Sequence, residues 1–287
     1  MPDQVMKILM LHGHDQSEQI FKPKARYIEA AFHSFAQENE VVFEFKYLSG
    51  ILPARPDQPD GHEKWVWGYG DPSDGEITNI ELSTQHILAT LHQKGPFVGI
   101  VGFSSGAAMA AIIASHLEKR SMFNDQPWVT EHSALRFAIC LSGFRLGPIY
   151  DKFYEPTIRT PILLAIGSYD PVITAEDSHS LAKHCQFARI FEFSGVHYVP
   201  QFKESRDFRK TLNDFLEEFL FDPPAQQAPR LSTQAGAIVR SPFNTRPFLR
   251  TYRRRREIAV ASGFTKRWAI SALGNQVAAN SITSASV

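Results

Sequence analysis

Residues 97–110 of the chain read FVGIVGFSSGAAMA, and this stretch decides how the rest of the sequence is interpreted. The apolar run at 97–101 has the length of a buried strand, and the alanines that follow suit a helix packed closely on a sheet. Between them, the pattern Gly-x-Ser-x-Gly predicts a tight turn from strand to helix with Ser104 at its apex. The two glycines fit such a turn because side chains there would collide with neighbouring backbone. The alternative is an ordinary turn in which the serine only caps the helix.

The composition is that of a soluble globular chain with a substantial core. It has 287 residues, of which 43% are hydrophobic and 12% aromatic, enough for one large domain or two small ones. The formal net charge is +0, but it is unevenly distributed. Residues 1–221 carry 20 Lys+Arg and 28 Asp+Glu, whereas residues 222–287 carry 10 and 2. The body is therefore acidic and the C-terminal part basic.

Several classes of protein are disfavoured by the sequence. The two cysteines, Cys140 and Cys185, are too few for a disulfide framework or a metal cluster, which favours a reducing compartment. The N-terminus is not basic, and the apolar run at 8–11 is too short for a secretory signal or a membrane span. We therefore expect a cytoplasmic protein with no membrane span, no metal and no cofactor.

Strand-length apolar runs alternate with segments of helical spacing along residues 5–221. This alternation predicts an α/β fold with a mostly parallel central sheet and helices on both faces. The expected strands are 5–11, 41–48, 97–101, 135–141, 161–167 and 188–193. The first expected helix begins near Pro23 and continues to 37. A later one begins at the tight turn around Ser104, which we call the elbow, and continues to about 119. The other expected helices are 80–92, 175–184 and 202–221.

A long connection at 49–79 has no clear period and contains four prolines. Loops of this length inside a compact domain are usually functional or disordered. The connection includes an aromatic cluster of Trp65, Trp67 and Tyr69, which is either a patch packed under the loop or a wall of an acyl or aromatic pocket.

The C-terminal part, 222–287, has no sustained apolar period and is expected to be a largely disordered basic extension to the domain at 1–221. The run Arg253–Arg256 fits a patch for nucleic acid, anionic membrane or targeting. We favour a solvated linker and expect no nucleic-acid partner.

A serine nucleophile needs a base within hydrogen-bonding reach and a third group that orients the base. In α/β folds with this turn, the chain order is Ser, then Asp or Glu, then His, each following a strand. Asp170 follows the run 161–167 and His197 follows the run 188–193, so both fit as partners of Ser104. The competing acids are Asp151 and Asp177, of which the latter is more simply a helix cap, and the competing histidines are His12, His179 and His184.

The mechanism also requires donors for the oxyanion of the tetrahedral intermediate. We expect two backbone N–H groups to supply them: that of Ser105 at the start of the elbow helix, and that of His14 in the loop after the first strand. The side chains of His12 and His14 resemble metal ligands, but no carboxylate or cysteine cluster accompanies them at ligand spacing.

Four motifs together resemble the eukaryotic FSH-type serine hydrolases over about residues 5–221. These motifs are LHGHDQS at 11–17 with Phe21 and Lys24, GFSSGA at 102–107, GSYDPV at 167–172, and GVH at 195–197. The resemblance implies a compact α/β-hydrolase without a large lid, with Ser104, Asp170 and His197 as catalytic triad. It also implies esterase or thioesterase activity, in some members within fungal secondary-metabolite pathways, where a polyketide is released from its carrier-protein thioester.

The resulting expectation is a serine hydrolase acting on a small-molecule or carrier-protein-bound acyl ester or thioester, with a polyketide synthase as a candidate partner. Two alternatives stay open: a general short-chain carboxylesterase with no dedicated pathway, and a non-catalytic module that keeps the fold. An intact Ser/Asp/His set argues against the module.

Overall fold

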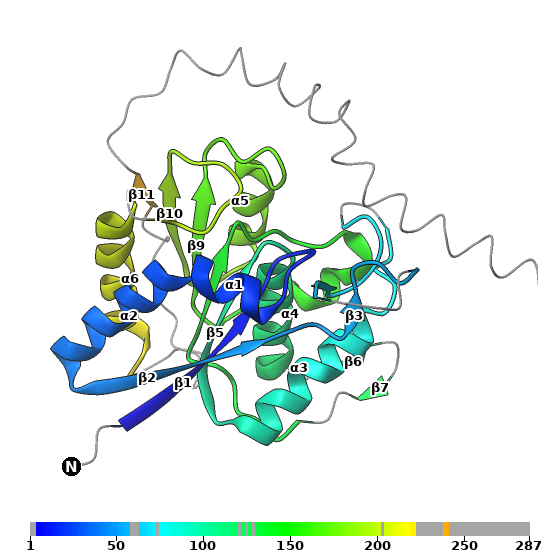
Figure 1. The fold of residues 1–287 in the computed structure, drawn as a ribbon, viewed down its shortest axis with the longest axis horizontal. Coiled ribbons are helices and arrows are strands. Elements are labelled where there is room, and N and C mark those ends of the chain that lie inside the picture. The colour runs from blue at the N-terminus through cyan, green and yellow to red at the C-terminus, as the bar shows by residue number, and fades with distance from the viewer. Residues whose placement is uncertain are drawn as a thin grey trace, which may run out of the picture.

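The computed structural model describes residues 4–57, 63–72, 75–119, 122–123, 126–127, 130–201, 204–221 and 238–240. Its centre is a sheet in which every pair of neighbouring strands is parallel (Figure 1). The strand order is β11-β10-β9-β8-β5-β1-β2. The strands are β1 (Gln4–Leu11), β2 (Val41–Leu48), β5 (Phe97–Phe103), β8 (Phe137–Leu141), β9 (Ile162–Gly167), β10 (Ala188–Phe193) and β11 (Ile238–Arg240). The mostly parallel sheet predicted from the sequence is thus confirmed.

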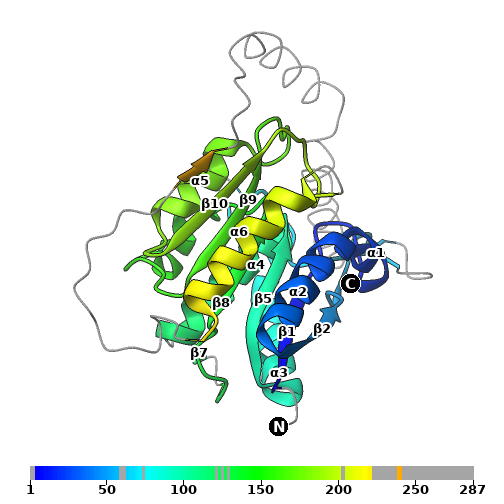
Figure 2. The same cartoon turned by 90° about the vertical axis from the view of Figure 1, so that its left-hand side faces the viewer.

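Helices cover both faces of the sheet, as expected. On one face lie α1 (Glu18–Lys24), α2 (Arg26–Asn39) and α6 (Ser205–Phe219), of which α2 and α6 are seen in front of the strands in Figure 2. On the other face lie α3 (Ile80–Lys94), α4 (Ser105–Lys119) and α5 (Ala175–Lys183). A 3-10 helix, η1 (Pro148–Phe153), lies in the connection between β8 and β9.

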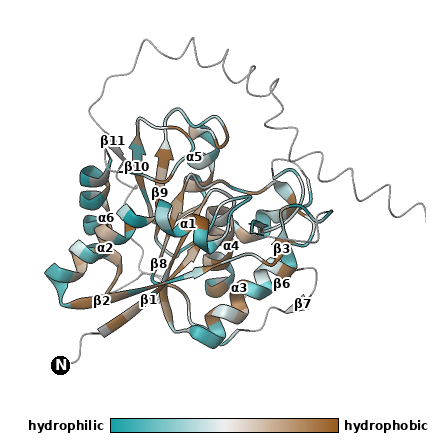
Figure 3. Cartoon of the chain, viewed as in Figure 1, coloured by the Kyte–Doolittle hydropathy of each residue, from teal (hydrophilic) through white to brown (hydrophobic). Residues whose placement is uncertain are grey.

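Helices pack on both faces of the sheet because both faces of its strands are apolar. Along β1, Ile8 and Met10 pack on the α2 and α6 side, whereas Leu9 and Leu11 pack on the α4 side. This alternation follows from the two-residue period of a strand. The resulting concentration of hydrophobic residues in the central strands is visible in Figure 3. Buried parallel strands are expected to be apolar on both faces, which is why the strands read as continuous runs.

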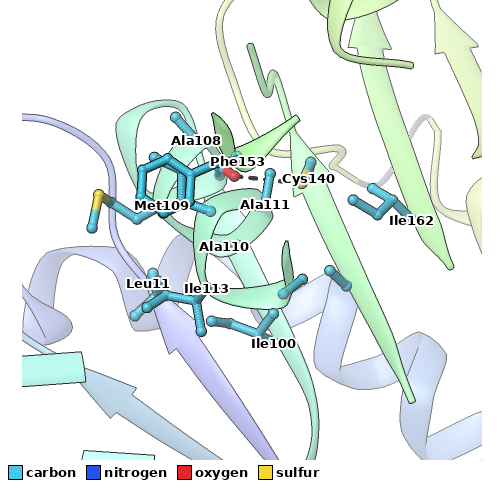
Figure 4. Close-up of a cluster of buried hydrophobic side chains, with 14 of the residues drawn as sticks. Leu11, Ile100, Ala108, Met109, Ala110, Ala111, Ile113, Cys140, Phe153 and Ile162 are labelled. Carbon is cyan, nitrogen blue, oxygen red and sulfur yellow. Dashed lines mark hydrogen bonds between the residues drawn. The ribbon is translucent and has the colours of Figure 1, made fainter. Parts of the chain in front are cut away.

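The helix α4 lies close against the sheet because its inner face is built from small residues. Ala107, Ala110 and Ala111 are fully buried there, together with Ile113. Figure 4 shows this cluster, in which side chains from four strands meet the helix: Leu11, Ile100, Cys140 and Ile162. The close packing fixes the N-terminus of α4, where the predicted elbow lies.

The first helical region differs from the prediction of one helix beginning near Pro23. Instead, α1 begins after Ser17, whose hydroxyl accepts a hydrogen bond from Ile20 N at 3.4 Å. Pro23 lies near the end of α1, and α2 begins at Arg26. The prediction missed the role of Ser17 as an N-cap residue, which starts a helix before the proline.

The remaining short elements are two antiparallel pairs. β3 (Leu52–Pro53) pairs with β4 (Trp65–Val66) inside the long connection after β2, and β6 (Met122–Phe123) pairs with β7 (Gln126–Pro127). Of the C-terminal extension, the structure describes only β11, which pairs with β10. The predicted disorder and the arginine run at 253–256 otherwise lie outside the described residues. Among the described helices, none is long and apolar enough to cross a membrane.

Candidate active site

Ser104 lies at the tight turn that the sequence predicts. β5 ends at Phe103 and α4 begins at Ser105, so a single residue joins strand to helix. That residue has a φ of 54°, in the left-handed region that non-glycine residues rarely adopt. A Cβ atom on Gly102 would meet Gly106 O at 2.2 Å, and one on Gly106 would meet His12 O at 2.3 Å. Both glycines are therefore required by close backbone contacts.

The structure brings Ser104, His197 and Asp170 together in one hydrogen-bonded chain. His197 Nε2 lies 3.0 Å from Ser104 Oγ, and His197 Nδ1 lies 2.7 Å from Asp170 Oδ2. Because an ionised carboxylate only accepts hydrogen bonds, Nδ1 carries the proton and Nε2 is left to accept from the serine hydroxyl. This is the arrangement in which a histidine can take a proton from a serine.

Asp170 is held firmly in this position. Its side chain is only 1% exposed, and its second oxygen, Oδ1, accepts hydrogen bonds from Val172 N at 2.8 Å and Ile173 N at 2.9 Å. The imidazole of His197 packs against the ring of Phe103, with centroids 4.9 Å apart. Both partners of the serine are thus oriented by the backbone and side chains around them.

The competing acids and histidines have other partners. Asp151 pairs with Arg145 at 2.8 Å. Asp177 forms a capping box with Thr174 at the start of α5, as its position predicts. His179 lies 3.7 Å from Glu192, and His184 Nδ1 lies 2.9 Å from Ser180 O. None of these four contacts involves Ser104.

The two residues expected to supply oxyanion donors lie on a common pocket. Ser105 is the first residue of α4, so its N–H belongs to the turn of the helix that lacks i−4 acceptors. His14 follows β1 in the segment that passes over the elbow, and both residues line the same pocket. Burial lowers the pKa of the His14 imidazole, which favours its neutral form.

This pocket is apolar and has about 370 Å³ of space, part of it open to solvent. One wall is Trp67 with Gly68, and the floor includes Ala108 and Met109 from the first turns of α4. The other lining residues are Pro72, Ile77, Ile80, Phe144 and Leu146. The arrangement can bury an apolar group next to Ser105.

Only one member of the predicted aromatic cluster lines this pocket. Trp67 is 3% exposed and forms a wall, as one interpretation of the cluster suggests. Trp65 instead pairs through its backbone with Gln16, and the Tyr69 hydroxyl donates to Pro53 O at 2.7 Å. Sequence reasoning missed Ala108, Met109 and Phe144, although Ala108 lies one helical turn after Ser104 and Phe144 follows a strand end.

His12 does not face the serine. It is fully buried, and its ring stacks on Trp67 with centroids 4.8 Å apart. Gly50 N donates to its Nε2 at 2.9 Å, and its Nδ1 donates to Gly13 O at 2.7 Å. Burial lowers its pKa to about 4, so the ring is neutral near pH 7. Within the described part of the chain, no group of three or more His, Cys, Asp or Glu residues is placed to hold a metal.

Comparison with known proteins identifies the family. Residues 1–209 match the family described as Serine hydrolase (FSH1). The chain belongs to this family. As a member of the FSH1 family, the protein is an enzyme, a serine hydrolase. The match spans the sheet as far as β10 and ends within the first turns of the last helix, α6.

The FSH1 relatives include proteins named as esterases. Esterase OVCA2 of Xenopus tropicalis is 29% identical over 233 residues, which cover 75% of this chain and 94% of the relative. Esterase CG5412 of Drosophila melanogaster is 29% identical over 234 residues, covering 78% and 79%. A Schizosaccharomyces pombe protein named Dihydrofolate reductase is 26% identical over 235 residues. The match covers 77% of this chain but only 48% of that protein.

Among solved structures, Arabidopsis thaliana SOBER1 superposes on this FSH1 member with a TM-score of 0.52. The match covers 74% of this chain and 99% of that chain at 17% sequence identity. This likeness concerns the fold, and it agrees with the α/β-hydrolase architecture expected from the sequence motifs.

Proposed function

We propose that this serine hydrolase cleaves an acyl ester or thioester with Ser104 as the nucleophile, His197 as general base and Asp170 as the partner of the histidine. The observation that carries the proposal is the continuous hydrogen-bonded chain from Ser104 Oγ through the imidazole to Asp170 Oδ2. Few arrangements other than a catalytic triad need a strained serine, a correctly oriented imidazole and a buried carboxylate at one place.

In the proposed reaction, neutral His197 takes the proton of Ser104 as Oγ attacks the acyl carbonyl. Asp170 stabilises the imidazolium that forms, and His197 then gives its proton to the leaving alcohol or thiol. Water, activated by the same histidine, hydrolyses the acyl-enzyme. The N–H groups of Ser105 and His14 are the proposed oxyanion donors, and losing one such donor costs about 3 kcal/mol of transition-state stabilisation.

The apolar pocket beside Ser105 is the proposed site for the acyl group. Its lining has no charged side chain, because burial favours the neutral form of His14. An apolar acyl group would displace water from this pocket and gain hydrophobic stabilisation. Of the three aromatic residues considered from the sequence, Trp67 is the one that we propose contacts the substrate.

A fluorophosphonate probe tests the nucleophile. We expect the wild-type protein to be labelled covalently, and Ser104→Ala to remain unlabelled while keeping the wild-type melting temperature. A folded wild-type protein that does not react with the probe would contradict catalysis by Ser104 and would favour the non-catalytic module.

We further propose that the natural substrate is a thioester, carried by a protein or a small thiol, and that a polyketide synthase is the source of the acyl group. Support comes from the similarity of the motifs to fungal polyketide-releasing thioesterases. The alternative, a general carboxylesterase, is supported by the names of the relatives. A panel that pairs each acyl group as thioester and as aryl ester distinguishes them: cleavage of aryl esters only would exclude the thioesterase.

We also propose that residues 1–221 form the hydrolase domain, to which the described part of 222–287 adds only the edge strand β11, that 222–287 is dispensable for catalysis, and that the enzyme acts in the cytoplasm. α6 ends at Phe219 and the family match ends at 209. Cys140 and Cys185 are buried thiols that form no disulfide, as suits a reducing compartment. Deleting 222–287 should leave kcat/KM intact. A lost activity in the folded, truncated protein would assign the extension a catalytic role.

A further inference from the structure

The segment 12–16, which carries the proposed oxyanion donor His14, is fastened to the long connection after β2 rather than to the sheet alone. Gln16 and Trp65 exchange two backbone hydrogen bonds, of 2.7 and 3.4 Å. Lys64 Nζ lies 3.4 Å from Asp15 Oδ2. These contacts hold the end of the segment that is farther from β1.

The other end is held through His12. Its carbonyl oxygen accepts a hydrogen bond from Trp67 Nε1 at 2.8 Å, and its ring stacks on the same indole. The ring also accepts from Gly50 N, while Nδ1 donates to Gly13 O at 2.7 Å. Both nitrogens of the neutral imidazole are therefore used. His12 joins Gly50, Trp67 and the backbone that leads into His14 as one buried, hydrogen-bonded unit.

Trp67 belongs to this unit and to the pocket at the same time. One part of its indole lines the pocket proposed for the acyl group, and its N–H bonds to the carbonyl of His12, two residues before His14. The aromatic wall thus has a second connection, to the segment that carries an oxyanion donor. A buried indole N–H needs an acceptor, and because that acceptor is here the carbonyl of His12, the wall and the segment are joined.

We propose that Trp67 and His12 are positioning residues for the oxyanion hole, and that they couple the wall of the acyl pocket to the backbone N–H of His14. This inference rests on the proposed function, in which His14 donates to the oxyanion. The wall then affects the rate even for an acyl group too short to touch it. Small displacements of such a donor are costly, since a misplacement of about 1 Å can lower a rate by about a hundredfold.

The decisive variant is Trp67→Phe, which keeps an aromatic wall and removes the N–H. The substrate is an aryl acetate, whose acyl group is too small to fill the pocket. We expect kcat/KM for the acetate to fall by about tenfold or more because the oxyanion donor is displaced. A methyl trifluoromethyl ketone, which forms an oxyanion adduct with a serine, should bind more weakly by a similar factor. Equal acetate turnover by the folded variant and the wild type would overturn the coupling.

Phe144→Leu is the matched control because it alters another wall of the same pocket, in the loop after β8. Its effect should grow with acyl length, so that kcat/KM falls more for an octanoate than for an acetate. Trp67→Phe should instead lower both. Melting temperatures of each variant exclude a loss caused by unfolding. An effect of Trp67→Phe that is confined to octanoate would make the residue a wall only and contradict the proposal.

A double-mutant cycle with His12→Phe tests whether both residues act through the same segment. The ring of phenylalanine can stack on Trp67 but offers no nitrogen to Gly50. We expect the double variant to lose less activity than the product of the two single losses, because one displaced segment underlies both. Multiplicative losses would contradict a shared unit. If wild-type enzyme neither cleaves esters nor reacts with fluorophosphonate, the proposed function fails, which is distinct from a failed coupling in an active enzyme.

Discussion

His197 Nε2 and Ser104 Oγ lie 3.0 Å apart although 93 positions separate them in the chain. The parallel sheet makes this contact possible because it places the carboxyl ends of β5, β9 and β10 at one edge. Ser104 follows β5, Asp170 follows β9 and His197 follows β10. The site is therefore assembled from three loops on a common scaffold.

Replacing Asp170 should separate its role in orienting His197 from its role in the loop. Asp170→Asn keeps an oxygen that can accept from Val172 N and Ile173 N, but it no longer favours the protonated Nδ1. We expect kcat to fall by about 10⁴ with little loss of stability. Asp170→Ala should lose similar activity and a further 1–3 kcal/mol of unfolding free energy, roughly, because two buried N–H groups lose their acceptor.

The control for this pair is Asp177→Asn, which alters the capping box of α5. It should cost about 1 kcal/mol in the free energy of unfolding and leave esterase kcat unchanged. Urea unfolding and initial rates measure both quantities. If Asp177→Asn rather than Asp170→Asn abolishes turnover, the assignment of the acid is wrong.

Gly106→Ala should damage the turn at Ser104 and segment 12–16, which carries the proposed oxyanion donor, together. The added Cβ would lie 2.3 Å from His12 O and 2.6 Å from Leu11 O, so backbone must move. We expect a loss of about 1–3 kcal/mol in stability and a large loss of kcat. Gly75→Ala is the control, since its Cβ would meet nothing closer than 3.6 Å. Similar melting temperatures and similar rates for the two variants would show that the close backbone contacts of Gly106 are not the cause of the loss.

The buried His12 makes stability depend on pH. Its folded pKa is lowered by burial from 6.5 to about 4, so the unfolded chain binds this proton more readily. The contribution of His12 to the free energy of unfolding is complete above pH 6.5 and is lost as the pH falls toward 4. This loss lowers the free energy of unfolding by about 3 kcal/mol. Urea unfolding across this range should show a steeper decline for the wild type than for His12→Phe. Parallel curves would mean that His12 is not the titrating group.

Filling the pocket should change which acyl groups are accepted. Ala108→Val adds two methyl groups to the pocket floor, so we expect kcat/KM to fall for octanoate relative to acetate by about tenfold. Ala111→Val lies on the same helix but faces the core, and should destabilise the fold without changing this ratio. The ratio for a series of esters is the measurement. An unchanged ratio in Ala108→Val would place the acyl group elsewhere.

Much of the scaffold was predictable because its signals are local or periodic. Buried parallel strands read as apolar runs, and Ser104 is flanked by glycines whose necessity follows from close backbone packing. Asp170 and His197 could be selected by chain order and by their positions after strands. Their hydrogen bonds then follow from the sheet, not from any further feature of the sequence.

The long connection after β2 could not be predicted in the same way. Nothing in the spacing of Trp65, Trp67 and Tyr69 says which side chain faces the pocket, because that depends on the pairing of Trp65 with Gln16. His12 was weighed only as a rival base or a metal ligand. Its actual partners, Gly50 and Trp67, are 38 and 55 positions away and are brought to it by tertiary structure.

The position of β5 between β1 and β8 means that the proposed nucleophile and the segment 12–16, which carries the proposed oxyanion donor, differ in local stability. Opening β5 requires breaking ladders on both of its sides, whereas segment 12–16 depends on contacts with a connection whose described residues form the two-residue ladder of β3 with β4 and the isolated bridge between Tyr69 and Thr78. Local opening should therefore occur in that connection at low urea, with fast amide exchange at 64–67 and slow exchange in β5. The enzyme would lose activity before it loses its fold, and would regain it without refolding the sheet.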